Sequence, residues 1–162
     1  RGAMAYDYPR AADLPGAGFA AGPCLLKDTM QLAAFNNNNF TLGHAAMMVN
    51  EGLPLYVVHR LEQRFDLATM TVGILGMGFK ADSDDPRDSL SYKLKRILAF
   101  KAAGVLTTDP HVVTDADLVP LDAVLQRADV LVIGAPHTAY AGLKPRQPVI
   151  DIWDLYGNGV VV

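Results

Sequence analysis

The sequence predicts an α/β protein in which a doubly wound parallel sheet follows a mainly helical segment. Two observations predict this class. After about residue 69, short runs of apolar and β-branched residues alternate with helical patterns, and such alternation produces parallel sheets covered on both faces. Before that point, apolar residues recur at three- and four-residue steps, as they do in a helix. We therefore expect two parts, residues 1–68 and residues 69–162.

The first part contains one long helical pattern, from 41 to 65, preceded by a run of four asparagines at 36–39 that predicts a polar break between two helices. Pro54 interrupts the long pattern. A proline inside a helix removes a hydrogen bond and costs about 3 kcal/mol, so we expect a kink or two shorter helices. A long helix with an apolar face needs a partner, which favours a homodimer formed through residues 41–65.

The second part has a Rossmann-like order of elements. Strands are expected at 69–75, 105–108, 129–134 and 148–152, with an edge strand at 159–162, and helices at 89–103, 118–127 and 137–143. Gly104 is expected to follow the first of these helices as its C′ residue. Ligands of such sheets bind beyond the carboxyl ends of the strands. The functional loops are therefore expected at 76–89, 109–117, 134–138 and 151–158.

The composition excludes several classes of protein. The chain has 162 residues, of which 51% are hydrophobic, so it can bury a core. Its net charge of −3 and the absence of a basic stripe argue against nucleic-acid binding. No apolar run reaches the roughly 18 residues that span a membrane, and no secretory signal opens the chain. The single cysteine, Cys24, forms no intrachain disulfide, and we expect a cytoplasmic protein.

A glycine-containing turn, GILGMG at 73–78, follows the first expected strand. It is not the G-x-G-x-x-G fingerprint of a dinucleotide site, and its acidic partner would be Asp109, at a longer spacing than usual. Two interpretations remain open at this point. The segment is either a dinucleotide site or a strand-to-loop turn that needs glycine.

The loop that follows, FKADSDDPRDS at 79–89, contains six charged residues. Lys80 and Arg87 are its cations, and a phosphate binds well to such groups beside the free N–H groups of a helix N-terminus. Ser89 can cap the helix that begins there. The alternative is a solvated loop with local ion pairs.

A second candidate site surrounds Cys24, which ends a glycine-rich loop. Lys27 and Asp28 follow it within about one helical turn. A nearby lysine lowers the pKa of a thiol, whose thiolate is the nucleophile, and a carboxylate can orient water or act as a base. The alternative is a buried structural cysteine at the start of a helix, with Asp28 as a capping residue.

Together these segments resemble the nucleotide-sugar 6-dehydrogenases, the family of UDP-glucose, GDP-mannose and UDP-N-acetylmannosamine dehydrogenases. The similar segments are PGAGFAAGPCLLKD at 15–28, NEGLPLYVV at 50–58 and VGILGMGFKADSDDPRDS at 72–89, with TDP following at 108–110. Three motifs in the right order are far more specific than any one of them. The resemblance covers most of the chain and weakens after about residue 135.

The resemblance implies an NAD-dependent oxidation of the 6-hydroxymethyl group of a UDP-sugar to the carboxylate of a uronic acid, in two steps through a cysteine thiohemiacetal and thioester. It implies that Cys24 is the nucleophile, that Lys27 is a cation near the active site and that Asp28 assists water or proton transfer. Residues 1–68 would hold the cysteine loop and the dimerisation helix, and 69–162 the UDP-sugar-binding domain. The implied substrate-binding residues are Phe19, Gly22, Lys80, Arg87 and, across the dimer, Arg10.

Two departures from the family matter. The family's N-terminal NAD-binding domain, its upstream catalytic glutamate and its lysine–asparagine pair are absent from the sequence. We therefore expect a C-terminal fragment that is inactive alone, with NAD bound mainly by the missing domain. Where many members have an arginine after the last strand, this chain has IWD at 152–154, so the sugar and the base stay unassigned. The alternatives are a non-catalytic nucleotide-binding or dimerisation module and a generic flavodoxin-like domain, although the cysteine loop argues against the latter.

The four histidines show no metal-ligand spacing with one another or with Cys24, so no metal site is expected. We interpret them as structural or surface residues. His137 is the strongest exception, because it follows a strand's carboxyl end. Trp153 is interpreted as a packing residue, with stacking on uracil as the alternative.

Overall fold

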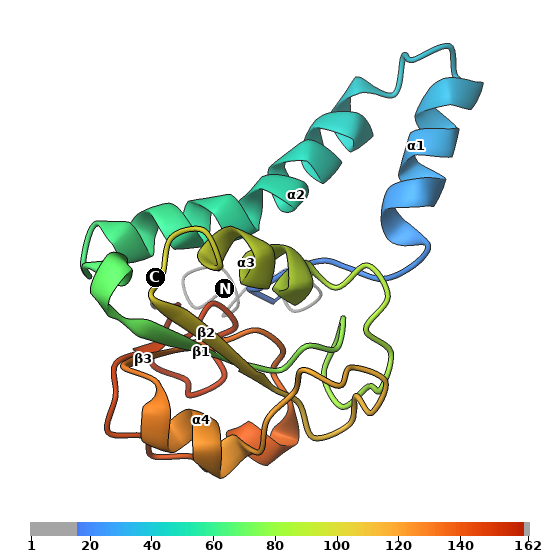
Figure 1. The fold of residues 1–162 in the computed structure, drawn as a ribbon. Helices are drawn as coiled ribbons and strands as arrows, with labels where there is room; N and C mark the ends of the chain where they lie inside the picture. Colours follow the sequence, from blue (N-terminus) through green and yellow to red (C-terminus); the bar gives the residue numbers. More distant parts are fainter. Residues whose placement is uncertain (1–15, 161–162) are drawn as a thin grey trace, which may run out of the picture.

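The computed structural model describes residues 16–160 and confirms the α/β class. A parallel sheet of four strands has the order β2-β1-β3-β4 (Figure 1). The strands are β1 (Thr71–Leu75), β2 (Gly104–Thr108), β3 (Val130–Ile133) and β4 (Val149–Ile150). Their carboxyl ends meet at one edge of the sheet, where the expected functional loops begin.

Helices cover both faces of the sheet, so the doubly wound arrangement is also confirmed. Helices α2 (Thr41–Glu62) and α3 (Leu90–Leu98) lie on one face and α4 (Leu121–Arg127) on the other (Figure 1). The central strand β1 is buried from its second residue onward. A Cβ atom added at Gly73 would lie 2.6 Å from Val124 of α4, so glycine allows this helix to approach the sheet closely.

Helix α1 (Leu25–Phe35) and the first half of α2 form a hairpin that projects away from the sheet (Figure 1). The asparagine run between them ends α1 as predicted, because Asn37 and Asn38 adopt left-handed backbone with φ of 49° and 60°. Helix α2 continues through Pro54, so the prediction of two shorter helices is wrong. Figure 1 shows the expected bend instead.

Helix α3 begins as predicted and ends early. The side-chain oxygen of Ser89 accepts a hydrogen bond from the backbone N–H of Ser91, so Ser89 is the N-cap. The helix stops at Leu98 rather than at 103 because the chain turns back to form β2. The prediction of Gly104 as a C′ residue is wrong, since Gly104 is the first residue of β2 and pairs with Thr71.

Other boundaries also differ from the expectations. Pro120 precedes α4, which starts three residues later than the expected 118. Only a 3-10 turn, Thr138–Tyr140, forms within 137–143. Of the expected edge strand at 159–162, Gly159 and Val160 form no strand and the rest lies outside the described residues. Within residues 16–160, no helix combines the length and apolarity that crossing a membrane requires.

Candidate functional site

Cys24 lies at the surface, immediately before α1, where its carbonyl accepts the backbone N–H of Asp28 at 2.8 Å. The alternative of a buried structural cysteine is therefore wrong. The residues that lead to it, 16–23, form an irregular loop that we call the cysteine loop. An exposed thiol at a helix start is accessible to a substrate.

Lys27 and Asp28 follow on the first turn of α1. Their side chains form an ion pair of 3.1 Å and are both more than half exposed, so the pair contributes little to stability. Asp28 raises the pKa of Lys27 above its usual value, and the charge of Cys24 adds to this rise. The lysine cation therefore lies within electrostatic range of the sulfur.

Phe19 and Gly22 fix the course of the cysteine loop. Phe19 is buried and packs edge-on against Trp153, with ring centroids 6.1 Å apart. Gly22 has a φ of 123°, and a Cβ atom there would lie 3.2 Å from the ring of Phe79. Trp153 also donates its indole N–H to the carbonyl of Gly134, so the interpretation of Trp153 as a packing residue is confirmed.

Residues 79–88, which we call the lysine loop, contain two cations with different surroundings. The Arg87 guanidinium contacts both carboxylate oxygens of Asp85, at 2.7 to 3.0 Å. These bonds lower the pKa of Asp85 to about 2, with a smaller contribution from the charge of Lys80. Arg87 thus braces the loop, and the predicted local ion pair is present.

Lys80, by contrast, is exposed, and its ammonium lies 5.3 Å from the centre of the Phe79 ring. Within residues 16–160, no carboxylate lies within ion-pair distance of it. A cation held by an aromatic face rather than by an acid remains available to an anionic ligand.

Phe79 joins the cysteine loop to the lysine loop, because its ring contacts Gly22 and supports Lys80. The two loops also line a common cavity of about 110 Å³. Among the described residues around it are Gly22 and Leu25 on one side and Asp88 and Ser89 on the other. Cys24 and Lys80 belong to the two segments that line this cavity, but neither residue lines it. Their joint action on one substrate therefore stays a prediction.

Arg10, the remaining predicted site residue, lies outside the described residues. Of the others, Phe19 and Gly22 lie on the cysteine loop, with Cys24 directly after it. Lys80 and Arg87 lie on the lysine loop. The charge of Cys24 also contributes to a rise in the pKa of Arg87, after the larger effect of Asp85. The two loops are therefore electrostatic as well as steric neighbours.

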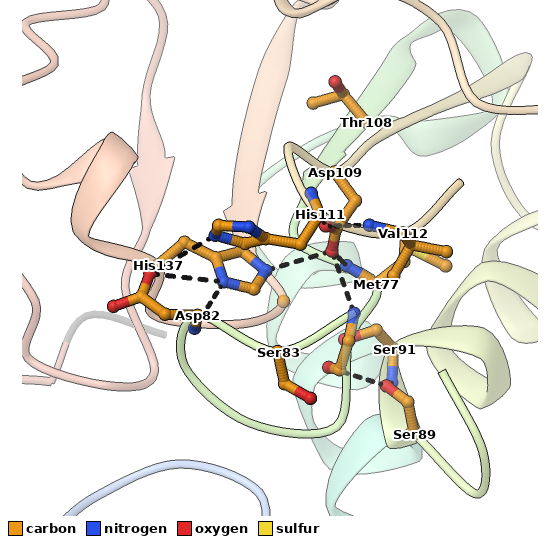
Figure 2. Close-up of polar contacts among 12 residues, drawn as sticks. Met77, Asp82, Ser83, Ser89, Ser91, Thr108, Asp109, His111, Val112 and His137 are labelled. Carbon is orange, nitrogen blue, oxygen red and sulfur yellow. Dashed lines mark hydrogen bonds and ion pairs between the residues drawn. The ribbon is translucent and has the colours of Figure 1, made fainter. Parts of the chain in front are cut away.

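A buried cluster around Asp109 closes the turn after β1 (Figure 2). One carboxylate oxygen of Asp109 accepts the backbone N–H groups of Met77 (2.6 Å) and Gly78 (2.9 Å) and a bond from His137 (3.0 Å). The other oxygen accepts the N–H groups of His111 and Val112. Burial would raise the pKa of Asp109, but the hydrogen bonds from His137 and the backbone outweigh it and hold this pKa far below its usual range.

This arrangement decides between the two interpretations of the GILGMG turn. The N–H groups of Met77 and Gly78, which would face a diphosphate in a dinucleotide site, are bonded to the protein's own carboxylate. Gly76 has a φ of 96°, and a Cβ atom there would lie 2.6 Å from the backbone nitrogen of Ala135. The turn therefore needs glycine for close packing, and its donors do not fit NAD.

His137 links the Asp109 cluster to the lysine loop. Its Nδ1 accepts the backbone N–H of Asp82 at 2.8 Å, which leaves the ring proton on Nε2 for donation to Asp109. Asp82 has a φ of 50°, and its carboxylate accepts both the N–H and the hydroxyl of Thr138. The sequence singled out His137 by its place after a strand, but it did not show these partners.

The fold also places His111 beside His137, which sequence spacing did not show. Their ring centroids are 5.0 Å apart, and ligand atoms of both rings and of Asp82 lie within 4.8 Å of one another. Spacing in the sequence did not indicate this grouping, and the expectation that no metal is bound stays a prediction. Both ring nitrogens of His137 are already hydrogen-bonded, however, so a metal ion would have to displace one of these bonds.

Known proteins resemble this chain over most of its length. Residues 73–158 match the family described as UDP-glucose/GDP-mannose dehydrogenase family, UDP binding domain. Two UDP-N-acetyl-D-mannosamine dehydrogenases are similar: that of Pyrococcus horikoshii is 29% identical over 87% of this chain, and that of Yersinia pestis 30% identical over 97%. The match covers 34% and 41% of those relatives, so the chain spans less than half of their length.

A solved structure confirms the similarity in three dimensions. The UDP-glucose dehydrogenase of Pyrobaculum islandicum superposes with a TM-score of 0.75 and 30% identity, covering 85% of this chain and 35% of that one. The family match includes the turn closed by Asp109, the lysine loop, the last three residues of β1 and the strands β2 to β4. The chain therefore belongs to the UDP-glucose/GDP-mannose dehydrogenase family, and it contains that family's UDP-binding domain.

Proposed function

We propose that this chain is the cysteine-bearing and nucleotide-binding portion of an NAD-dependent nucleotide-sugar 6-dehydrogenase, with a UDP-sugar as its substrate. The observation that carries the proposal is the exposed Cys24 beside the lysine loop, in a chain of this family. In this proposal residues 1–68 provide the Cys24 thiol and residues 69–162 bind the nucleotide of the substrate. The dinucleotide belongs to a region outside this chain, because the turn at 76–78 is closed by Asp109.

The proposed roles follow from the chemistry of the side chains. NAD⁺, held mainly by a region outside this chain, would supply the hydride acceptor for each of the two oxidations at C6. The Cys24 thiolate adds to C6 of the intermediate aldehyde, forming a C–S bond while the carbonyl oxygen takes a proton. The second oxidation converts this thiohemiacetal to a thioester. Water then attacks the thioester as Asp28 takes one of its protons, and the C–S bond breaks to release the thiolate and the carboxylic acid, which loses its remaining proton to solvent.

The lysine loop holds the nucleotide in this proposal. The Lys80 ammonium is exposed and has no acidic partner within the described residues, which suits the substrate's diphosphate. Arg87 keeps the loop in shape through Asp85 rather than contacting substrate. Phe19 and the backbone at Gly22 line the sugar-nucleotide pocket, and Arg10 reaches a substrate from the partner subunit.

A homodimer through α2 completes the proposal. Several large apolar side chains of this helix are exposed, among them Leu42 (82%), Val49 (68%) and Leu55 (59%). Apolar surface repeated along a helix that projects from the sheet is suited to pairing with a second copy.

The test uses the complete enzyme with UDP-sugars. We expect two NADH for each sugar oxidised, with a uronic acid as product, and we expect Cys24→Ser to abolish its formation. Ser83→Ala, on the lysine loop, is the matched control and keeps the two-to-one ratio. A Cys24→Ser enzyme that still forms the carboxylate with two NADH would reject Cys24 as the nucleophile.

A further inference from the structure

The hydrogen bonds of the cysteine loop connect it to a single side chain of α2, that of Asn50. The backbone N–H of Ala20 donates to Asn50 Oδ1 at 3.0 Å, and Asn50 Nδ2 donates to the carbonyl of Ala20 at 2.5 Å. Among the described residues, these are the hydrogen bonds that residues 16–23 make. The hydrogen bonds that hold the loop backbone against the helix therefore come from one amide group, in addition to the apolar packing of Phe19.

Asn50 is itself held in a rigid setting. It is 8% exposed and lies four residues before Pro54, which has no N–H to offer the Asn50 carbonyl. Its neighbour Glu51 is tied to α3, because Lys93 Nζ donates to the Glu51 carbonyl at 2.6 Å and lies 3.3 Å from its carboxylate. The amide thus projects from a helix that is fixed to α3, and a functional group is positioned best from such an element.

Asparagine at position 50 is expected to lower the stability of the helix relative to an apolar residue. It has a lower helix propensity than alanine or leucine, and a buried amide is tolerated only when it is hydrogen-bonded. An apolar residue would stabilise α2 and pack against the loop without directing it. The paired bonds to Ala20 fix both the distance and the orientation of the loop backbone, which apolar packing does not do.

Little freedom remains between this anchor and the sulfur. Ala20 precedes Cys24 by four residues. Gly22 lies against the Phe79 ring, Pro23 has a fixed φ, and Cys24 is the N-cap of α1. A shift of Ala20 is therefore transmitted to the thiol, while Lys80 lies on the lysine loop, which the Phe79 ring joins to Gly22 rather than to Ala20.

We infer that Asn50 is a positioning residue for Cys24, which holds the cysteine loop so that the sulfur meets C6 of a sugar whose diphosphate is bound by Lys80. This inference rests on the proposed function. The diphosphate is bound by Lys80 and not by the cysteine loop, so the loss of Asn50 lowers kcat more than it raises KM for the nucleotide sugar.

The sharpest test is Asn50→Asp in the complete enzyme. The charged carboxylate accepts the Ala20 N–H but faces the Ala20 carbonyl without a donor, whereas the protonated carboxyl restores both bonds. At about pH 8 we expect kcat to fall at least about tenfold, with KM for the nucleotide sugar changed less than about threefold. Relative to wild type, kcat should recover as the pH is lowered to about 5.5, because a buried carboxyl has a raised pKa.

Other ionisable groups must be separated from this effect. Glu51, Asp88, Lys93 and Arg96 line the same cavity as Ala20. They are present also in Asn50→Ala, which lacks the new carboxyl, so a recovery at low pH that appears in Asn50→Asp and not in Asn50→Ala comes from the carboxyl at position 50. A loss that merely reflects weakened packing would not depend on pH in this way.

Hydrogen exchange of residues 16–23 gives a readout that does not need activity. At neutral pH the Ala20 amide should exchange about tenfold faster in Asn50→Ala, because its N–H loses the acceptor, and in Asn50→Asp, because the carboxylate repels the Ala20 carbonyl and loosens the pair. Leu61→Val is the control, since Leu61 is fully buried on the same helix and lies three turns away. It should lower stability while leaving loop exchange and kcat unchanged.

Each outcome is decisive. An Asn50→Asp enzyme with the kcat of the wild type, or with a loss that does not recover at low pH, overturns the inference. Unchanged loop exchange overturns it too. A wild-type enzyme without Cys24-dependent oxidation would refute the proposed function instead, and loop exchange would still report whether Asn50 anchors the loop.

Discussion

The Asp109 cluster and the surface that carries Cys24 and Lys80 treat polar groups in opposite ways. The Asp109 and His137 side chains are fully buried, and the Asp109 carboxylate accepts five hydrogen bonds (Figure 2). Cys24 and Lys80 are exposed, and Lys80 is supported by an aromatic ring rather than by an acid. The difference teaches that the buried polar groups, whose hydrogen bonds are complete, hold the loops in place. The exposed groups remain available to a ligand.

The largest effect is expected from breaking the buried side of this comparison. Asp109→Ala removes the acceptor of four backbone N–H groups and of His137, and unpaired buried donors are costly. We expect the free energy of unfolding, measured in urea, to fall by about 3–5 kcal/mol. Asp117→Ala is the control, because this side chain is 81% exposed, and it should change stability little. Equal stability of the two variants would show that the cluster does not hold the fold.

Lowering the pH should reduce the stability that the Asp109 cluster provides. The folded-state pKa of Asp109 lies below its unfolded value, so its contribution to stability is complete above about pH 4 and is lost as the pH falls toward the folded pKa. One such carboxyl contributes a slope of at most about 1.4 kcal/mol per pH unit. Urea unfolding between about pH 6 and pH 3 should therefore show a steeper loss for wild type than for Asp109→Asn. Parallel curves would contradict the low pKa.

The exposed side of the comparison predicts a ligand preference. Calorimetry with the 162-residue chain alone should detect weak binding of UDP and no binding of NAD⁺, because the backbone donors of the turn at 76–78 are bonded to Asp109. Lys80→Ala should weaken UDP binding about tenfold, the effect of one charge-assisted bond to phosphate. Tight NAD⁺ binding would instead restore the dinucleotide interpretation of this turn.

The smallest effect is expected at Arg87, on the exposed side of the comparison. Its guanidinium is engaged by Asp85, so Arg87→Ala should loosen the lysine loop and weaken UDP binding less than about threefold. The same calorimetric titration compares it with Lys80→Ala. A larger loss for Arg87→Ala than for Lys80→Ala would show that Arg87 contacts the nucleotide directly.

The fold was predictable where local composition decides it. Strands β1 and β3 are apolar runs buried on both faces, and Ser89 marks a helix start by a local hydrogen bond. Boundaries that depend on tertiary pairing were missed. Gly104 joins a strand because it pairs with Thr71, and no pattern around Gly104 alone shows that partner.

The site was predictable only in part for the same reason. The residues of the cysteine loop and the lysine loop are recognisable as contiguous motifs. The Asp109 cluster joins residues 28 to 32 positions apart, and Asn50 reaches a loop 30 positions away. Such separations leave no spacing signal in one sequence, so these contacts required the structure.

The most direct measurement is a crystal structure of the complete enzyme with a bound UDP-sugar. We expect Cys24 Sγ within about 3.5 Å of C6, the distance of a near-attack arrangement, and Lys80 Nζ within about 3 Å of a diphosphate oxygen. In the same structure the paired bonds between Asn50 and Ala20 should be intact. A diphosphate bound away from Lys80, or a sugar whose C6 lies beyond the reach of Cys24, would contradict the account.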